Sequence, residues 1–531
     1  MGGMTMKTLY FGGPILPLEG REPVQALLVE NGKIRALGER SQVESLAKGA
    51  RPVDLEGRAL LPAFVDGHSH ITALAQTLGL CQLAGCKSLE EIGRRMQAFR
   101  KQWAIPAGEW VIGFGYDQND LAEGRHPTAA ELDALLPDCP AMVTHASGHM
   151  GAVNSLGLRQ LGITRDTPDP EGGKIGRLAD GAPNGYLEET AFTSMGSRIP
   201  RDPQEGLKNL QRAQQVYFSH GIATIHEGLA RQPEWDLLES AASQGVLQGD
   251  VAAYVDIKDS ASLIERHPDY LHGYKNRLKI AGYKLFLDGS PQGRTAWMKA
   301  PYLGGKPDYR GYPVYQDGQV LAFLEKAQQD GLQIAVHCNG DAAAEQLLGC
   351  YERAYETYRR DIRPVMIHAQ LLRPDQVPRL RPLGMIASFF VAHVYHWGDV
   401  HIQNFGWERA SQISPAKTAL DSGVMFDFHQ DSPVIPPNML ETLWCAVCRR
   451  TRSGKELGEN QRLTPLQALT AITRNAAYAL FEEREKGTLA PGKRADLVIL
   501  DRDPLACPAE ELGDLQVLET IKDGETVYRK K

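Results

Sequence analysis

The sequence predicts an α/β fold: a (β/α)8 TIM barrel with a small β-sandwich built from both chain ends. The central part of the chain alternates short apolar strands with helix-like stretches, which is the pattern of a parallel sheet. Both ends are instead rich in short strands punctuated by glycine. The chain has 531 residues, which is too long for one ordinary core and suits one large domain plus a smaller one.

The two ends of the chain are alike in composition. TLYFGG, ALLVENGKIRALG and PVDLEGRAL near the N-terminus are β-rich, and so are ADLVILD and TVYRK near the C-terminus. Strand-like segments of this length need partner strands to be stable. We therefore predict that residues 1–58 and 486–531 pair into one β-sandwich domain. Two unrelated terminal arms are the alternative interpretation.

Residues 59–485 are predicted to form the barrel. Its apolar strands include GIATIHEG, DVAAYVD, LQIAVHCNGD, RPVMIHAQ and GVMFDFHQD, and helix-like segments such as GQVLAFLEKAQQDG lie between them. Repeated βα units favour a (β/α)8 barrel over a doubly wound sheet, because no GxGxxG motif follows an early strand. A stretch at about 105–200 is rich in Gly, Pro and polar residues, and we predict it to be an insertion that helps to wall the active site.

Composition and charge argue against several classes of function. The net charge is −7 and no long block of Lys and Arg stands out, so no nucleic-acid partner is expected. No apolar stretch approaches the roughly 20 residues that span a bilayer. The N-terminal MGGMTMKTLYFGG lacks the apolar core of a signal peptide. We therefore expect a cytoplasmic protein with no membrane partner.

The cysteines offer neither a disulfide framework nor a convincing metal site. The chain has eight of them, which is sparse for its length. Cys445 and Cys448 form one CxxC, but no second pair follows to complete a zinc ribbon. The segment LWCAVCRR has the apolar spacing of a helix, so both thiols are predicted to be small buried hydrophobic groups.

The first chemical motif is the pair His68 and His70 at the end of the apolar run LLPAFVDGHSH. Residues two apart in a strand point to the same face. Two imidazoles on one face at the exit of an early barrel strand form half of a metal site. Alone the motif is weak, because the chain contains 15 histidines.

Three further polar residues each end an apolar strand, where the active sites of barrels lie. His337 ends LQIAVH, His368 ends RPVMIH and Asp431 ends GVMFDFHQD. The interval from His337 to His368 fits one βα unit, and the interval from His368 to Asp431 fits two. If these are strands 5, 6 and 8, all three residues project into the same barrel mouth as the histidine pair.

Lys284 lies inside the apolar strand IAGYKLFLDGS, on the unit that precedes His337. A lysine there is costly unless it is paired or chemically altered. A neutral buried amine can react with carbon dioxide, and the resulting carbamate is an anionic oxygen ligand able to bridge two metals. The alternative is an ion pair, for which Asp288 is the nearest candidate in the sequence. The position of Lys284 between the HxH pair and His337 in strand order favours the ligand.

This order of residues, HxH followed by Lys, His, His and Asp at successive strands, resembles the amidohydrolase superfamily. More closely, the chain is similar to the YtcJ-like amidohydrolases, or amidohydrolase 3 group, which includes N-substituted formamide deformylase. The motifs that carry the resemblance extend over nearly the whole chain: LLPAFVDGHSH, GFGYDQND, ELDALLPDCPAMVTHASGHMGAVNS, GYLEE, GIATIHEG, YKLFLDGSPQGRTA, HCNGDAA, IHAQ, DSPV and KGTLAPGKRADLVILD.

The resemblance implies a barrel plus β-sandwich fold, one or two divalent metal ions that are usually zinc, and a homodimer. It implies four histidine ligands: His68, His70, His337 and His368. It also implies that Lys284 is a carbamylated bridging ligand and that Asp431 is both a ligand and the catalytic base. The sequence departs from the family pattern before the aspartate, where His429 and Gln430 replace an expected Gly-Ser. His429 is an extra polar group near the metal or a structural histidine deeper in the barrel.

Four other histidines are candidates for the substrate pocket. His149 in THASGHMGAVN is predicted to stabilise the developing oxyanion, and His145 in the same segment is predicted to bind substrate. His226 is placed at a strand end in GIATIHEG, and His393 in the loop after strand 7. The alternative for His145, His149 and His226 is that each is a buried structural histidine.

The predicted reaction is hydrolysis of a small-molecule amide, an N-formyl or N-acyl compound, by metal-activated water. Asp431 takes the proton from that water and returns it to the leaving nitrogen. A deaminase, a lactonase or a D-aminoacylase on the same scaffold is an alternative, since only the pocket decides between them. An alternative of another class is a non-catalytic scaffold protein of the same fold.

Overall fold

The computed structural model describes residues 7–20, 22–148, 150–170, 173–194, 203–271, 273–304 and 306–531. The chain divides into two compact units. The first comprises Met1–Leu74 and Leu210–Lys531, and the second comprises Ala75–Asn209. The insertion predicted at about 105–200 therefore falls within the second unit, while the predicted division of the first unit into sandwich and barrel stays a prediction.

An eight-stranded parallel sheet forms the centre of the first unit. Its strands follow one another in chain order across the sheet, and every neighbouring pair is parallel. They are β6 (Phe64–Val65), β13 (Ile222–Ala230), β14 (Asp250–Asp256), β15 (Leu278–Phe286), β16 (Gln333–Cys338), β17 (Val365–His368), β18 (Ile386–Phe389) and β19 (Phe426–Phe428). The strands are buried almost throughout, as expected for a parallel sheet with both faces covered.

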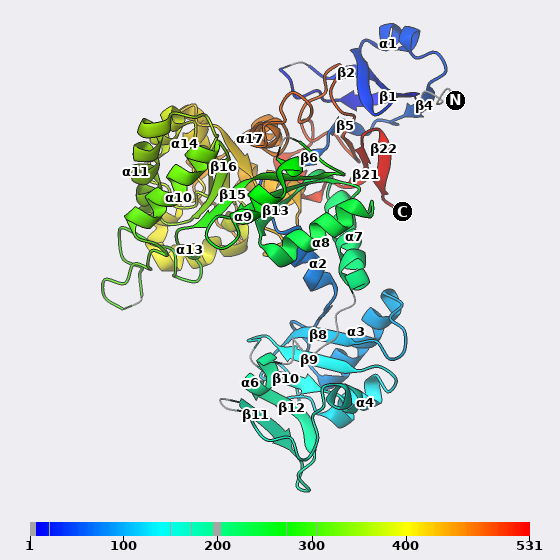
Figure 1. Ribbon diagram of the computed structural model, residues 1–531. Coiled ribbons are helices and arrows are strands. Elements are labelled where there is room, and N and C mark those ends of the chain that lie inside the picture. Colours follow the sequence, from blue (N-terminus) through cyan, green and yellow to red (C-terminus); the bar gives the residue numbers. More distant parts are fainter. Residues whose placement is uncertain are drawn as a thin grey trace. The chain divides into compact units, whose positions relative to one another are not determined.

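Helices connect these strands, as βαβ units require, and further helices follow the last strand. The main ones are α2 (Ile71–Leu78), α7 (Pro203–Ser219), α8 (Gln232–Ser243), α9 (Ser262–Arg266), α10 (Asp317–Asp330), α11 (Asp341–Tyr358), α12 (Val377–Leu380), α13 (His393–Ala410), α14 (Ala416–Asp421), α15 (Met439–Cys448), α16 (Pro465–Thr470) and α17 (Ala476–Ala479). Helices α10, α11 and α14 lie outside the strands around β15 and β16 (Figure 1). The CxxC cysteines lie buried in α15, as predicted.

The first and last strands of the central sheet are joined just beyond their carboxyl ends. The amide of His70 donates a hydrogen bond of 2.8 Å to the carbonyl of Ser432. The amide of Asp431 donates one of 3.2 Å to the carbonyl of His68. The sheet is therefore curled, and these two bonds bring the HxH segment beside the aspartate.

Both chain ends contribute to a second eight-stranded sheet. The order is β22-β21-β20-β5-β1-β2-β3, with β4 paired to β1. The strands are β1 (Lys7–Ile15), β2 (Val24–Glu30), β3 (Lys33–Gly38), β4 (Arg51–Asp54), β5 (Ala59–Pro62), β20 (Leu497–Leu500), β21 (Val517–Lys522) and β22 (Glu525–Arg529). The antiparallel pairing of β5 with β20 joins the two ends, and the first and last described strands, β1 and β22, both belong to this sheet (Figure 1). A two-sheet sandwich stays a prediction.

The second unit has its own sheet and its own core. The sheet order is β11-β12-β10-β9-β8-β7. The strands are β7 (Cys81–Gln82), β8 (Val111–Tyr116), β9 (Ala141–His145), β10 (Met150–Val153), β11 (Gly173–Arg177) and β12 (Pro183–Glu189). Helices α3 (Leu89–Gln102), α4 (Ala129–Leu135), α5 (Ser155–Gln160) and α6 (Thr190–Thr193) complete it. In neither unit does a helix of the described residues have the length and apolar character to cross a membrane.

Candidate metal centre

Six residues predicted as ligands lie at one end of the central sheet. They occupy the carboxyl ends of the strands or the residues that follow: His68 and His70 after β6, Lys284 near the end of β15, His337 on β16, His368 at the end of β17, and Asp431 after β19. In the order of the sheet, His337, His368 and Asp431 thus belong to the fifth, sixth and eighth strands. All six residues therefore lie at the carboxyl ends of the strands, on the same side of the molecule's central sheet.

The carboxylate of Asp431 lies at the centre of this group. Its Oδ1 is 3.3 Å from Nε2 of His70 and 3.7 Å from Nε2 of His68, and its Oδ2 is 3.9 Å from Nε2 of His368. Although Oδ1 is buried, no described residue gives it a well-oriented hydrogen bond. Donor atoms of His68, His70 and Asp431 lie within 4.8 Å of one another, so these three residues can hold a metal ion.

Lys284 is fully buried and faces the same group. Its Nζ is 3.2 Å from Nε2 of His68, and no carboxylate of the described residues forms an ion pair with it. The alternative partner, Asp288, instead accepts hydrogen bonds from the amides of Asn339 and Gly340. Burial lowers the pKa of the Lys284 amine to about 7, against a smaller opposing effect of Asp431. A substantial fraction of this amine is therefore neutral near pH 7.

His337 and His368 present ring nitrogens to each other, and His368 also faces Asp431. Nε2 of His368 is 3.1 Å from Nδ1 of His337, and the other nitrogen of His337 lies 3.2 Å from the carbonyl oxygen of Gly289. Burial lowers the pKa of His337 to about 4 and that of His368 well below its usual value. Both rings are therefore neutral at pH 7, which is the form that binds metals.

Two acidic residues close to the predicted ligands are not indicated by any motif or spacing in the sequence. Glu227 follows His226 on β13, and its Oε1 is 3.5 Å from Nδ1 of His70. Burial lowers the pKa of His70, but contacts with Asp431 and Glu227 outweigh burial and raise it to about 9. Two carboxylates thus favour a positive charge at this position. Such carboxylate partners commonly orient metal-binding histidines.

The second of these acids, Asp66, fixes the turn that carries the HxH pair. Its Oδ1 accepts a hydrogen bond of 3.2 Å from the amide of His68, and its Oδ2 accepts one from the hydroxyl of Ser69. Tyr217 donates a further bond of 2.7 Å to the Ser69 hydroxyl. The only sequence signal for Asp66 is its place in VDGHSH, directly before the motif.

Backbone strain accompanies the site. His368 has φ of +73° and Asp431 has φ of +55°, in the left-handed region that side chains other than glycine rarely adopt. Such conformations cost on the order of 1–3 kcal/mol each and cluster at functional sites. His368 is the last residue of β17, and Asp431 lies three residues after the end of β19.

Two histidines predicted for the pocket take places that differ from the prediction. His226 lies within β13 rather than at its end; it is buried against Tyr254, and neither ring nitrogen has a hydrogen-bond partner among the described residues. His393 begins helix α13 rather than lying in a loop. Its ring packs 4.5 Å from that of Phe390, which in turn lies 6.2 Å from the ring of His368. Phe390 thus contacts the rings of both His393 and the predicted ligand His368.

The other two pocket candidates belong to the second unit. His145 ends β9, and its Nδ1 is hydrogen-bonded to the hydroxyl of Ser147 at 2.8 Å. Its Nε2 lies 3.7 Å from a carboxylate oxygen of Asp117. His149 lies outside the described residues. Its predicted role and that of His145 stay predictions.

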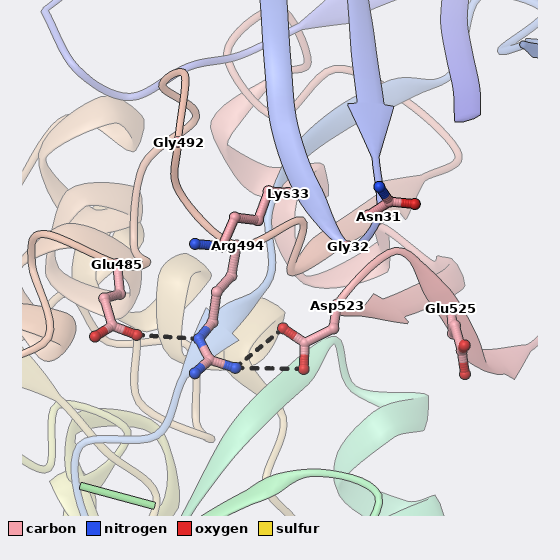
Figure 2. Close-up of a pocket in the computed structure, with 8 residues that line it drawn as sticks. All are labelled: Asn31, Gly32, Lys33, Glu485, Gly492, Arg494, Asp523 and Glu525. Carbon is pink, nitrogen blue, oxygen red and sulfur yellow. Dashed lines mark hydrogen bonds and ion pairs between the residues drawn. The ribbon is translucent and has the colours of Figure 1, made fainter. Parts of the chain in front are cut away.

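A hollow of about 610 Å³ lies elsewhere in the first unit, between the two chain ends (Figure 2). It is lined by Asn31, Gly32, Lys33, Glu485, Gly492, Arg494, Asp523 and Glu525. Arg494 bridges Glu485 and Asp523 across it. The lining includes none of the predicted catalytic or ligand residues, so this hollow is not the candidate active site.

Comparisons with known proteins agree with the resemblance seen in the sequence. The pattern Amidohydro_3, described as amidohydrolase family, matches residues 51–528. The chain is 28% identical over 536 residues to a Bacillus subtilis protein named as an amidohydrolase, YtcJ; the match covers 99% of this chain and 100% of that protein. It is also 28% identical over 533 residues to N-substituted formamide deformylase of Arthrobacter pascens, covering 95% of each chain.

A solved structure resembles the fold as a whole. The crystal structure of an uncharacterized metal-dependent hydrolase from Pyrococcus furiosus superimposes with a TM-score of 0.75 at 27% sequence identity. The superposition covers 94% of this chain and 100% of that one. The match therefore includes residues of both units and is not limited to the central sheet.

Proposed function

The chain belongs to the amidohydrolase family, and on this premise we propose that it is a metal-dependent hydrolase of a small-molecule amide. The bond cleaved is the C–N bond of an N-formyl or N-acyl compound. The observation that carries the proposal is the Asp431 carboxylate, whose buried oxygen lacks a well-oriented hydrogen bond while imidazole nitrogens surround it. The deformylase relative, named for cleaving N-substituted formamides, supports the substrate class.

The proposed ligands are His68, His70, His337, His368 and Asp431, with Lys284 as a sixth. Four imidazoles and a carboxylate are the donor set that zinc and similar divalent ions prefer. The neutral state of the His337 and His368 rings, caused by burial, keeps their lone pairs free for a cation. Six ligands at the carboxyl ends of the strands support a site for one or two ions.

Lys284 is proposed to carry a carbamate derived from carbon dioxide. The neutral amine attacks the carbon of carbon dioxide, and an N–C bond forms while one C=O π bond becomes a C–O⁻ bond. The nitrogen then loses a proton to water, which leaves an anionic carbamate. Burial of Lys284 and the absence of a carboxylate partner among the described residues support this step, since a protonated amine cannot attack. The carbamate would add a negative oxygen ligand beside His68, which lies 3.2 Å away.

When bound, a divalent ion lowers the pKa of a water molecule to about 7 and polarises the scissile carbonyl. The chain's own residues then handle the proton. Asp431 accepts it from the attacking water and delivers it to the leaving nitrogen, so that the amine departs neutral. The strained backbone at Asp431 holds the carboxylate in place for both transfers.

Pocket, fold and assembly complete the proposal. His149 is proposed to stabilise the developing oxyanion, with His145, His226 and His393 as substrate-binding residues.

We further propose that the curled sheet closes as a (β/α)8 barrel over residues 59–485. The chain-end strands, residues 1–58 and 486–531, are proposed to form a sandwich, and the active form to be a cytoplasmic homodimer. The hydrogen bonds that join the segments after β6 and β19 support closure.

The experiment that tests the function is a substrate screen of the protein reconstituted with zinc, cobalt or manganese. Panels of N-formyl, N-acyl and N-acyl-amino-acid compounds are assayed by mass shift. Release of formate or another carboxylic acid together with an amine is the expected result. Release of ammonia from a ring amine would identify a deaminase, and opening of lactones alone would identify a lactonase. A chain that takes up no divalent metal would favour the non-catalytic scaffold.

The Lys284→Ala variant tests the carbamate. We expect it to lose bound metal and turnover because the anionic ligand is gone. Partial rescue by short carboxylates such as acetate would support a carbamate, since they can fill the same position. Unchanged metal content, measured by elemental analysis, would remove Lys284 from the ligand set.

A further inference from the structure

A histidine that departs from the family pattern lies directly behind one of the proposed ligands. His429 follows β19 and is fully buried. Its Nε2 is 3.1 Å from Nδ1 of His368, and its Nδ1 is 2.8 Å from the hydroxyl oxygen of Ser388 on β18. The amide of His429 also donates a bond of 3.2 Å to the carbonyl of Phe389, which fixes its backbone. The three side chains therefore form one chain of contacts, Ser388–His429–His368.

The direction of these hydrogen bonds follows from which nitrogen of His368 faces the site. Nε2 of His368 points to His337 and to the Asp431 carboxylate, at 3.1 Å and 3.9 Å. A neutral imidazole that binds a metal through Nε2 carries its proton on Nδ1. That proton is donated to Nε2 of His429. His429 then carries its own proton on Nδ1 and donates it to the Ser388 oxygen, so that both of its ring nitrogens are satisfied.

We propose that Ser388 and His429 form a positioning pair that holds His368 in its metal-binding tautomer and orientation. His429 acts behind the ligand and not as a ligand, because its only nitrogen near the site is occupied by His368. This inference rests on the proposed metal-dependent function. It adds a residue that neither the donor set nor the ordered motifs assign.

The acceptor at His368 differs from the usual one. Metal-binding histidines usually donate their second N–H to a carboxylate, a carbonyl or water. At His368 the acceptor is instead Nε2 of His429, 3.1 Å away.

The test compares His429→Phe, which keeps a ring but removes both nitrogens, with His429→Gln, whose amide oxygen can accept the His368 proton. Zinc affinity is measured by chelator competition without substrate, and the cobalt-substituted proteins are compared by absorption spectroscopy. We expect His429→Phe to bind zinc about 10- to 100-fold more weakly. We expect His429→Gln to recover most of the affinity, and both variants to keep the wild-type number of bound ions. Ser388→Ala should show a smaller loss of the same kind.

His267→Phe is the matched control, because this histidine packs on Trp235 and pairs with Glu239 away from the site. It should leave zinc affinity unchanged. Equal affinity in wild type and His429→Phe overturns the inference, and so does failure of His429→Gln to rescue. Loss of a bound ion or a changed cobalt spectrum in His429→Phe overturns it in favour of a direct ligand. If zinc affinity depends on His429 but no amide is hydrolysed, the proposed function fails while this inference stands.

Discussion

Buried charged groups are arranged differently at the amino ends and at the carboxyl ends of the strands in the central sheet. At the amino ends of the strands, buried charges are paired with one another. At the carboxyl ends, buried donor atoms converge on Asp431, one of whose oxygens has no well-oriented hydrogen bond among the residues described. Both regions belong to the first unit and are built on the same strands. The contrast therefore separates charged groups that pair with one another from groups that we propose to hold a metal ion.

The paired end is a network around Asp250, the first residue of β14. Its Oδ2 is 2.6 Å from the ammonium of Lys486 and 2.7 Å from that of Lys522, and its Oδ1 accepts a bond of 3.2 Å from Arg277. Lys522 also bonds Asp496 at 2.8 Å. This network ties the central sheet to β21 and to the segment before β20, and so joins the two sheets of the unit.

The largest effect should come from Asp431→Asn at the carboxyl end. The amide cannot accept the proton from water, so turnover should fall about 10²- to 10⁴-fold. The fold should stay intact, with metal retained at least in part, because the strain and shape at this position are unchanged. Steady-state kinetics, metal analysis and circular dichroism check this. Asp399→Asn, whose carboxylate pairs with Lys455 on the surface, is the control, and near-normal turnover in Asp431→Asn would remove Asp431 from its role.

The matching change at the amino end is Lys486→Met. It removes the cation that Asp250 and Glu482 share, while Asp250 keeps Lys522 and Glu482 keeps Lys279. Because a buried pair is broken at each carboxylate, we expect a loss of about 3–5 kcal/mol in the free energy of unfolding. Chemical denaturation measures this loss. Lys417→Met breaks an exposed pair with Asp421 and should cost about 1 kcal/mol or less. Zinc affinity should be unchanged in both; a Lys486→Met protein with weakened zinc binding would show that the two ends are coupled.

A smaller effect is expected from Glu227→Gln, which tests the carboxylate behind His70. The amide keeps the shape but loses the charge that orients the imidazole, so zinc affinity should fall by about 10-fold. Chelator competition measures it, with stability followed by thermal unfolding. A loss of stability without any change in affinity would make Glu227 a purely structural residue.

The smallest effect concerns acid stability at the paired end. Burial raises the pKa of Glu482, but Lys486 and Lys279 outweigh burial and lower it to about 2. A depressed carboxylate pKa gives stability that is full above the unfolded value of about 4.5 and is lost as pH falls toward 2. Glu482→Gln should therefore flatten the dependence of unfolding free energy on pH in this window. Identical slopes in variant and wild type would contradict the assignment.

The sequence identifies the candidate metal ligands better than it identifies the residues that hold those ligands in place. His337 and His368 each end an apolar run, so strand register alone brings them to one edge. Glu227 and Ser388 lie within strands whose apolar pattern they merely interrupt, and their partners are far away in sequence. Nothing in spacing identifies such contacts. They depend on the curvature of the sheet, which a linear pattern does not encode.

The same reasoning explains the two misplaced histidines. His226 in GIATIHEG is predicted at a strand end, but β13 continues to Ala230. His393 was expected in a loop, but the segment after β18 turns directly into α13. In both cases the boundary of an element, rather than its type, was wrong, since boundaries depend on tertiary hydrogen bonds that local composition does not report.

The pairing of β5 with β20 has a consequence for synthesis. Ala59 lies opposite Leu500, so the edge of β5 emerges from the ribosome long before its partner exists. At about 5–20 residues per second, the wait is roughly 20 to 90 s. During that time the edge of an apolar strand is open to wrong pairing. Newly made chains should therefore depend on chaperones more than the finished protein does. Removal of β20, β21 and β22 should lower the yield of folded protein more than it lowers the activity of the molecules that fold.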